Sequence, residues 1–136
     1  MPFVLDKSVS CGWFLENQAS QYTEAIARRL EEDHAVVPAL WELELTNVLR
    51  TACVRGLCDA QAAQQTVQRI VSLPIRVDRQ PVRPSETLAL ALRFGLSSYD
   101  ACYLELALRL QLPLATVDGP MRAAALASGV GVVSPA

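Results

Sequence analysis

The chain has 136 residues, of which 51% are hydrophobic and 19% charged, and its formal net charge is −2. This length and composition fit one folded domain over residues 1–136 and exclude a disordered chain. With no apolar run near the ~18 residues of a membrane span and no signal-peptide pattern at the start, we expect a soluble, cytoplasmic protein with no membrane partner.

Short apolar segments alternate with segments of helical periodicity along the whole sequence. In the first half we predict strands over 3–5 and 34–37. Helices are predicted over 8–15, from an N-cap at Ser20 to about Leu30, and from about Trp41 to a stop at Gly56.

The second half continues the same alternation. Helices are predicted from an N-cap at Asp59 as far as Pro74, then over 84–95, 98–110 and 119–129, and strands over 75–77, 114–117 and 130–133. The 98–110 segment is apolar nearly all round and should form a buried, central helix. Short strands separated by helices predict an α/β fold with a mainly parallel sheet covered on both faces.

Carboxylates are the main candidates for chemistry, because the sequence has a single histidine, His34, and so lacks material for a histidine-rich site. Asp6 and Asp118 each follow a predicted strand, where open α/β sheets bind their ligands. Each of these two could instead be a helix N-cap. Asp100, in the first turn of its helix, favours the positive end of the helix dipole whatever its function.

Glu44 is harder to explain as a structural residue. It lies on the apolar stripe of its helix, between Trp41 and Val48, where a carboxylate needs an ion pair or a metal. No basic residue stands at the neighbouring helical positions, so the partner must come from elsewhere. Asn47, one turn later, either holds this carboxylate or is a plain surface residue, whereas Glu42 is read as a solvated surface acid.

These acids stand in four short segments spread along the chain. The segments are Val-Leu-Asp6-Lys-Ser8, Trp41-Glu-Leu-Glu44-Leu-Thr-Asn47, Ser-Ser-Tyr-Asp100-Ala-Cys and Leu-Ala-Thr116-Val-Asp118. In order and spacing they resemble the successive motifs of PIN-domain ribonucleases, specifically VapC-type toxins. Each motif alone is weak, but the likeness extends over essentially the whole chain.

The resemblance implies a PIN-like three-layer α/β/α sandwich with a short, mainly parallel central sheet. It also implies that an acidic cluster binds one or two Mg²⁺ or Mn²⁺ ions, supported by nearby polar groups. The acids would be Asp6, Glu44, Asp100 and Asp118, and the supporting groups Ser8, Asn47 and Thr116. Some family members have a further polar or acidic residue after the last acid, where this chain has Gly119-Pro120, so the number of ions stays open.

Elementary electrostatics agrees that such a cluster needs a cation, since without one some of the acids must take up protons or move apart. Four ionised carboxylates held ~6 Å apart would repel by roughly 3 kcal/mol per pair at an effective dielectric constant near 20, of order 15 kcal/mol in all. That total rivals the whole stability of a domain, ~5–15 kcal/mol. Oxygen ligands favour hard ions such as Mg²⁺ or Mn²⁺. Outside the cluster, 12 basic residues would face 10 acidic ones, and eleven of the basic residues are arginine, which suits phosphate contacts.

The leading hypothesis is therefore a metal-dependent endoribonuclease toxin that hydrolyses RNA phosphodiester bonds. The resemblance further implies a homodimer and a small cognate antitoxin of VapB type that inhibits the enzyme. The alternative is a catalytically silent PIN-like module that binds RNA or a protein. A third hypothesis, a phosphotransferase with Asp6 as the nucleophile, is disfavoured because position 8 is serine where one such pattern requires a second aspartate.

Overall fold

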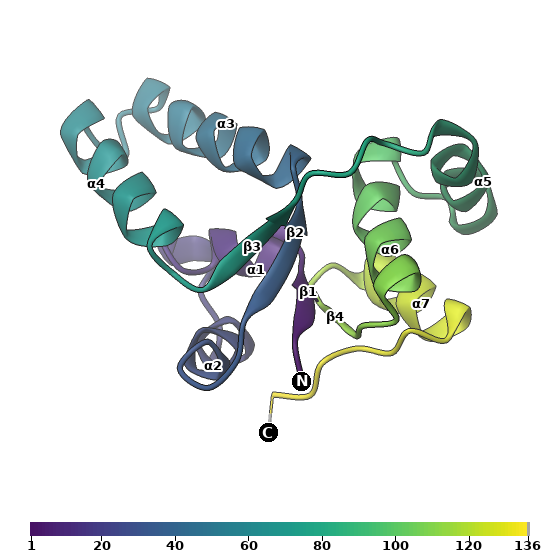
Figure 1. Ribbon diagram of the computed structural model, residues 1–136. Coiled ribbons are helices and arrows are strands. Elements are labelled where there is room, and N and C mark those ends of the chain that lie inside the picture. Colours follow the sequence, from purple (N-terminus) through teal and green to yellow (C-terminus); the bar gives the residue numbers. More distant parts are fainter. Residues whose placement is uncertain (136) are drawn as a thin grey trace.

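The computed structural model describes residues 1–135. Within that range a four-stranded sheet lies between two layers of helices (Figure 1). Its strands are β1 (Phe3–Leu5), β2 (Ala35–Pro38), β3 (Ile75–Asp78) and β4 (Leu114–Ala115). They stand in the order β3-β2-β1-β4, and every neighbouring pair is parallel. The expected three-layer α/β/α architecture with a short, mainly parallel sheet is confirmed.

The helices divide between the two faces of the sheet in chain order. One face carries α1 (Lys7–Cys11), α2 (Gln21–Arg29), α3 (Leu40–Val54) and α4 (Ala60–Val71), and the other carries α5 (Pro84–Phe94), α6 (Ser98–Leu110) and α7 (Gly119–Ser128) (Figure 1). A short 3-10 helix, η1 (Glu16–Gln18), links α1 to α2. No helix within the described residues is long and apolar enough to cross a lipid bilayer.

Local capping chemistry sets several of these helix ends, as the sequence predicts. Ser20 accepts a hydrogen bond from the backbone of Thr23 at the start of α2, and Asp59 does the same for α4. Gly95 closes α5 with a positive φ of 64°, which costs glycine nothing because it has no Cβ. The first helix is shorter than the expected 8–15, because it ends at Cys11 and a turn begins at Gly12.

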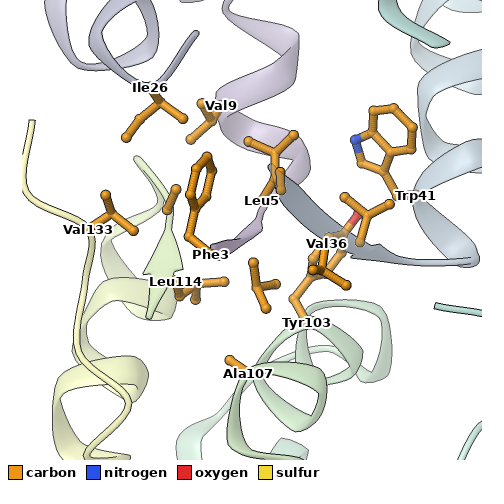
Figure 2. Close-up of a cluster of buried hydrophobic side chains, with 14 of the residues drawn as sticks. Phe3, Leu5, Val9, Ile26, Val36, Trp41, Tyr103, Ala107, Leu114 and Val133 are labelled. Atoms are coloured by element: carbon orange, nitrogen blue, oxygen red, sulfur yellow. The ribbon is translucent and has the colours of Figure 1, made fainter. Parts of the chain in front are cut away.

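The hydrophobic core surrounds β1, whose three residues are completely buried. Figure 2 shows Phe3 directed toward Val9 and Ile26 on one side, while Tyr103 and Ala107 of α6 lie on the other side of the sheet. This agrees with the expectation that the apolar helix over 98–110 is central and buried. Because β1 is anchored from both layers, the residue that follows it has a fixed position.

The predicted last strand, over 130–133, is wrong. The structure has only an isolated parallel bridge there, between Leu114 and Val132. Gly129 and Gly131 both have positive φ values, 87° and 79°, so the backbone turns twice and cannot extend along β4. The strand predicted over 114–117 is also shorter, because the chain leaves the sheet after Ala115.

Candidate active site at the carboxyl ends of β1 and β4

The order of the strands identifies where a ligand site is expected. The chain moves from β1 to β2 and β3 in one direction and then returns to place β4 on the other side of β1. Open parallel sheets bind ligands at such a switch in strand order, outside the carboxyl ends of the strands. Asp6 directly follows β1 and Thr116 directly follows β4. The first and last predicted motifs therefore meet at this switch point.

Asp6 is the most buried of the four predicted acids, with 2% of its surface exposed. It precedes α1 but makes no side-chain capping bond to that helix. Instead its Oδ2 accepts hydrogen bonds from the hydroxyls of Ser8, at 2.7 Å, and Thr116, at 2.8 Å. Its Oδ1 is buried without a hydrogen-bond partner among the described residues. Capping therefore does not explain Asp6, and one carboxylate oxygen remains available for a ligand.

The environment of Asp6 disfavours its ionised form. Burial raises the pKa of Asp6 to about 6, although the hydrogen bonds from Ser8 and Thr116 work in the opposite direction. The negative charge of Asp100 adds to the increase, and the positive charge of Lys7 reduces it. A nearby cation would favour the ionised form of this carboxyl group.

Ser8 and Thr116 join the ends of β1 and β4 through their hydroxyl groups, whose oxygens are 3.3 Å apart. The Ser8 hydroxyl also accepts a hydrogen bond from the backbone N–H of Val117, and the Thr116 hydroxyl accepts one from that of Asp118. These contacts hold the chain after β4 against the end of β1. Both residues thus lie at the site, as supporting groups of Asp6.

Glu44 receives two partners from other parts of the chain. Its side chain is only 14% exposed, and its Oε2 lies 2.7 Å from the Nζ of Lys7 in α1. Its Oε1 accepts a hydrogen bond of 2.6 Å from the hydroxyl of Tyr103 in α6. Burial and this hydrogen bond raise the pKa of Tyr103, so its hydroxyl stays protonated and acts as the donor. This partly buried acid is therefore paired, as expected, but with residues that sequence reasoning missed.

Asp100 lies in the first turn of α6, on the same side of the site as Lys7. Its Oδ1 is 4.0 Å from the Lys7 ammonium, and its backbone N–H donates to the capping hydroxyl of Ser97. Partial burial raises the pKa of Asp100, and the charges of Asp118 and Glu44 add to the increase while Lys7 opposes it. The negative charges of the other acids therefore disfavour the ionised form of Asp100.

Asp118 is the N-cap of α7, the structural role that its sequence context also allowed. Its Oδ2 accepts a hydrogen bond of 2.9 Å from the backbone N–H of Met121. This bond fixes the carboxylate at the positive end of the helix dipole and beside the Thr116 that supports Asp6. A cap does not exclude a second function, because a carboxylate has further acceptor sites.

Asn47 is not brought to this group. It is exposed on α3, where it borders a surface depression of about 200 Å³ together with Val48, Thr51 and Arg55. No hydrogen bond within residues 1–135 joins it to Glu44. Glu42, two residues before Glu44, lies at the surface as expected, with 43% of its side chain exposed, and forms a bidentate pair with Arg79 there, at 2.7 and 3.1 Å.

Three of the four acids, Glu44, Asp100 and Asp6, have the ammonium group of Lys7 as a neighbouring charge. Lys7 pairs with Glu44 and Asp100, and its charge also acts on Asp6. In the described part of the chain, no group of three or more Asp, Glu, His or Cys residues has the close arrangement of a metal site.

A signal for Lys7 was present in the sequence, since it is the one lysine and directly follows Asp6. Tyr103 could have been found because it lies three residues after Asp100 on the same helix face.

Comparisons with known proteins give a consistent result. The family model described as the PIN domain matches residues 3–126. Ribonuclease VapC12 of Mycobacterium tuberculosis is 34% identical over 116 residues, which is 85% of this chain and 86% of that protein, in each of two strains. The crystal structure of PAE2754 from Pyrobaculum aerophilum superposes with a TM-score of 0.70 over 98% of this chain and 91% of that one. At 23% identity, this last likeness concerns the fold alone.

Proposed function

The chain belongs to the PIN-domain family, among its VapC-type members, and on that basis we propose that it is a metal-dependent endoribonuclease toxin. In this proposal it hydrolyses RNA phosphodiester bonds in the cytoplasm and is inhibited by a small cognate antitoxin of VapB type. We include a homodimeric state, which the resemblance to VapC-type toxins implies. The similarity to a protein named ribonuclease VapC12 supports the nuclease activity.

The observation that carries the proposal is the unpartnered Oδ1 of Asp6. A buried polar atom without a partner is costly, and it is rare in folded proteins unless a ligand, ion or water satisfies it. This atom lies at the switch point of the sheet, and the negative charge of Asp100 acts on the same carboxyl group. The donors are all carboxylate oxygens, which suit Mg²⁺ or Mn²⁺ better than Zn²⁺. The chemistry of these side chains therefore suits a hard divalent ion, and within residues 1–135 the acids would have to move closer together to hold one.

We propose that Asp6, Glu44, Asp100 and Asp118 would hold one or two such ions. A bound divalent ion supplies a water molecule of lowered pKa and neutralises charge on the non-bridging phosphate oxygens. The protein's own contribution is to fix the acids before substrate binds. Supporting hydrogen bonds of this kind orient ligands and are costly to remove.

Each acid is oriented by a different part of the fold. The hydroxyls of Ser8 and Thr116 both hold Oδ2 of Asp6, which leaves the other oxygen for the ligand. Tyr103 holds one oxygen of Glu44 from the opposite layer. The arrangement accounts for hydrolysis without a histidine base. Arginine side chains would guide the RNA backbone, preferably of single-stranded or looped segments whose bases are accessible.

The test is RNA cleavage with Mg²⁺ or Mn²⁺, with a chelator as the negative control. Asp6→Asn and Glu44→Gln are each expected to lower the rate by about 100-fold or more, beyond the 10–100-fold typical of residues that only support a metal. Glu42→Gln, on the same helix but paired with Arg79, is the matched control and should retain activity. Undiminished cleavage by the Asp6 variant would refute the proposal.

A second candidate is the catalytically silent module that binds RNA or a protein. The observation that favours it is the absence, within residues 1–135, of a preformed group of three close ligands. In that case RNA would bind without being cut, and divalent ions would leave the thermal unfolding temperature unchanged. Measuring RNA binding and this temperature with and without Mn²⁺ separates the two candidates.

A further inference from the structure

Lys7 has an unusual position for a charged residue of α1. It is the one lysine of the sequence, and its ammonium lies among the acids, 2.7 Å from Glu44 Oε2 and 4.0 Å from Asp100 Oδ1. Its side chain remains 39% exposed, so it reaches the group from the solvent side. The buried Oδ1 of Asp6 has no such partner.

The charges around Lys7 are unequal. No arginine within the described chain forms an ion pair with any of the four acids, and the one ammonium group acts on three of them, Glu44, Asp100 and Asp6. Burial lowers the pKa of Lys7, but the hydrogen bond to Glu44 and the charges of Glu44, Asp100 and Asp6 outweigh it and raise the pKa above its ordinary value. Lys7 therefore neutralises only part of the negative charge of these acids.

A divalent ion and this ammonium compete for the same oxygens. An ion bound to Glu44 and Asp100 would carry two positive charges within a few ångströms of Nζ, and like charges at such distances repel strongly. Lys7 has a flexible four-carbon stem and an exposed outer part, so it can turn into solvent without a change in the backbone. Tyr103, by contrast, is completely buried and can remain on Glu44.

We propose that Lys7 is an internal counter-ion that occupies the metal position of the unloaded chain, and that divalent ions bind by displacing its ammonium from Glu44 and Asp100. Lys7 is then a positioning residue that sets metal affinity. This inference rests on the proposed function, because it takes the acids to be metal ligands.

The test compares metal binding by the parent chain and by Lys7→Met, using calorimetric titration with Mn²⁺ and with Mg²⁺. Without a competitor, the variant should bind either ion about tenfold more tightly, since no ion pair has to be broken. Arg79→Met is the matched control, because it also removes an ion pair from α3, at Glu42, and it should leave the dissociation constant unchanged.

Thermal unfolding gives a second measurement that does not depend on catalysis. In a chelator, Lys7→Met should unfold at a lower temperature than the parent, because unbalanced carboxylates repel. Added Mn²⁺ should raise its unfolding temperature by more than it raises that of the parent. If the ion pair is purely structural, Lys7→Met should lower the unfolding temperature equally in the chelator and with Mn²⁺. That result, or an unchanged or weaker affinity of the variant for metal, overturns the inference. Lys7→Gln provides the same comparison if the methionine variant folds poorly.

Cleavage assays on the same samples separate this inference from the proposed function. If the parent chain cuts RNA only with metal while Lys7→Met binds metal no more tightly, the role of Lys7 falls and the nuclease activity stands. If neither protein binds metal, the role of Lys7 also falls. In that case, RNA cleavage by the parent chain without metal would show that the metal requirement is wrong. No RNA cleavage by the parent chain would show that the proposed nuclease activity is wrong.

Discussion

Asp6→Asn should make the metal-free protein more stable at neutral pH, even though it removes a residue of the candidate active site. The pKa of Asp6 lies at about 6 in the folded chain, against an ordinary 3.8. At about 1.36 kcal/mol per pH unit, this difference corresponds to about 3 kcal/mol. The group is 2% exposed, so solvent screening reduces the figure little.

The sign follows from which state holds the proton. Below pH 3.8 the carboxyl group is protonated in both states and burial carries no charge penalty. Between pH 3.8 and about 6 the unfolded chain is ionised first, so the free energy of unfolding falls as the pH rises. Above about 6 the folded state contains the buried anion, and the full loss of about 3 kcal/mol is present.

Asparagine has no charge to bury, but its amide N–H₂ would occupy the position of the unpartnered Oδ1. That costs about 1 kcal/mol at every pH. The variant should therefore be about 1 kcal/mol less stable than the parent at pH 3.5 and about 2 kcal/mol more stable at pH 7. Urea unfolding in a chelator, followed by the fluorescence of Trp13 and Trp41, measures both differences.

A matched control is Asp59→Asn, at the exposed N-cap of α4, where asparagine and aspartate serve about equally well. Its stability should follow that of the parent across the same pH range. The reasoning is refuted if the stability difference between Asp6→Asn and the parent is the same at pH 3.5 and pH 7, or if the variant is the less stable protein at pH 7.

Three further substitutions test the packing around the site by urea unfolding. Tyr103→Phe removes the 2.6 Å hydrogen bond to Glu44 and should lower the free energy of unfolding by about 1 kcal/mol and also lower the rate of RNA cleavage. Unchanged stability and rate would show that this bond does not orient the acid. Ser8→Ala removes a hydrogen-bond donor to the buried carboxylate of Asp6 and should lower the free energy of unfolding by about 1–2 kcal/mol at pH 7. The loss should be smaller at pH 3.5, where the carboxyl group is protonated, and a loss independent of pH would contradict this reasoning. Gly12→Ala would place its Cβ 2.6 Å from Cγ2 of Thr23 and should cost about 1–3 kcal/mol, so a neutral result would show that α2 can shift.

Much of the fold is encoded locally and could be read from the sequence. The strand at 3–5, the Ser20 and Asp59 caps and the Gly95 stop depend on residues within a few positions of one another. The alternation of strands and helices then allows few arrangements other than a covered parallel sheet. The order of the four acids was enough to indicate the family, which the comparisons confirm.

Other features depended on contacts between distant segments. Whether the run over 130–133 pairs as a strand depended on the backbone turns at Gly129 and Gly131, which periodicity does not reveal. Likewise, Asn47 and Glu44 are neighbours on one helix by spacing, yet only Glu44 receives partners from α1 and α6. Helical spacing defines which face a residue is on, but not what the opposite layer places against it.

The sequence by itself determined the set of acids and the sheet edge to which two of them belong, because strand ends and motif order are properties of the chain. Only the tertiary structure decided how these acids are neutralised. Glu44 is paired with Lys7 from 37 positions away and with Tyr103 from 59 positions away. Such pairs form because folding removes the carboxylate from water, and the groups that then compensate its charge are those that the packed layers bring within reach.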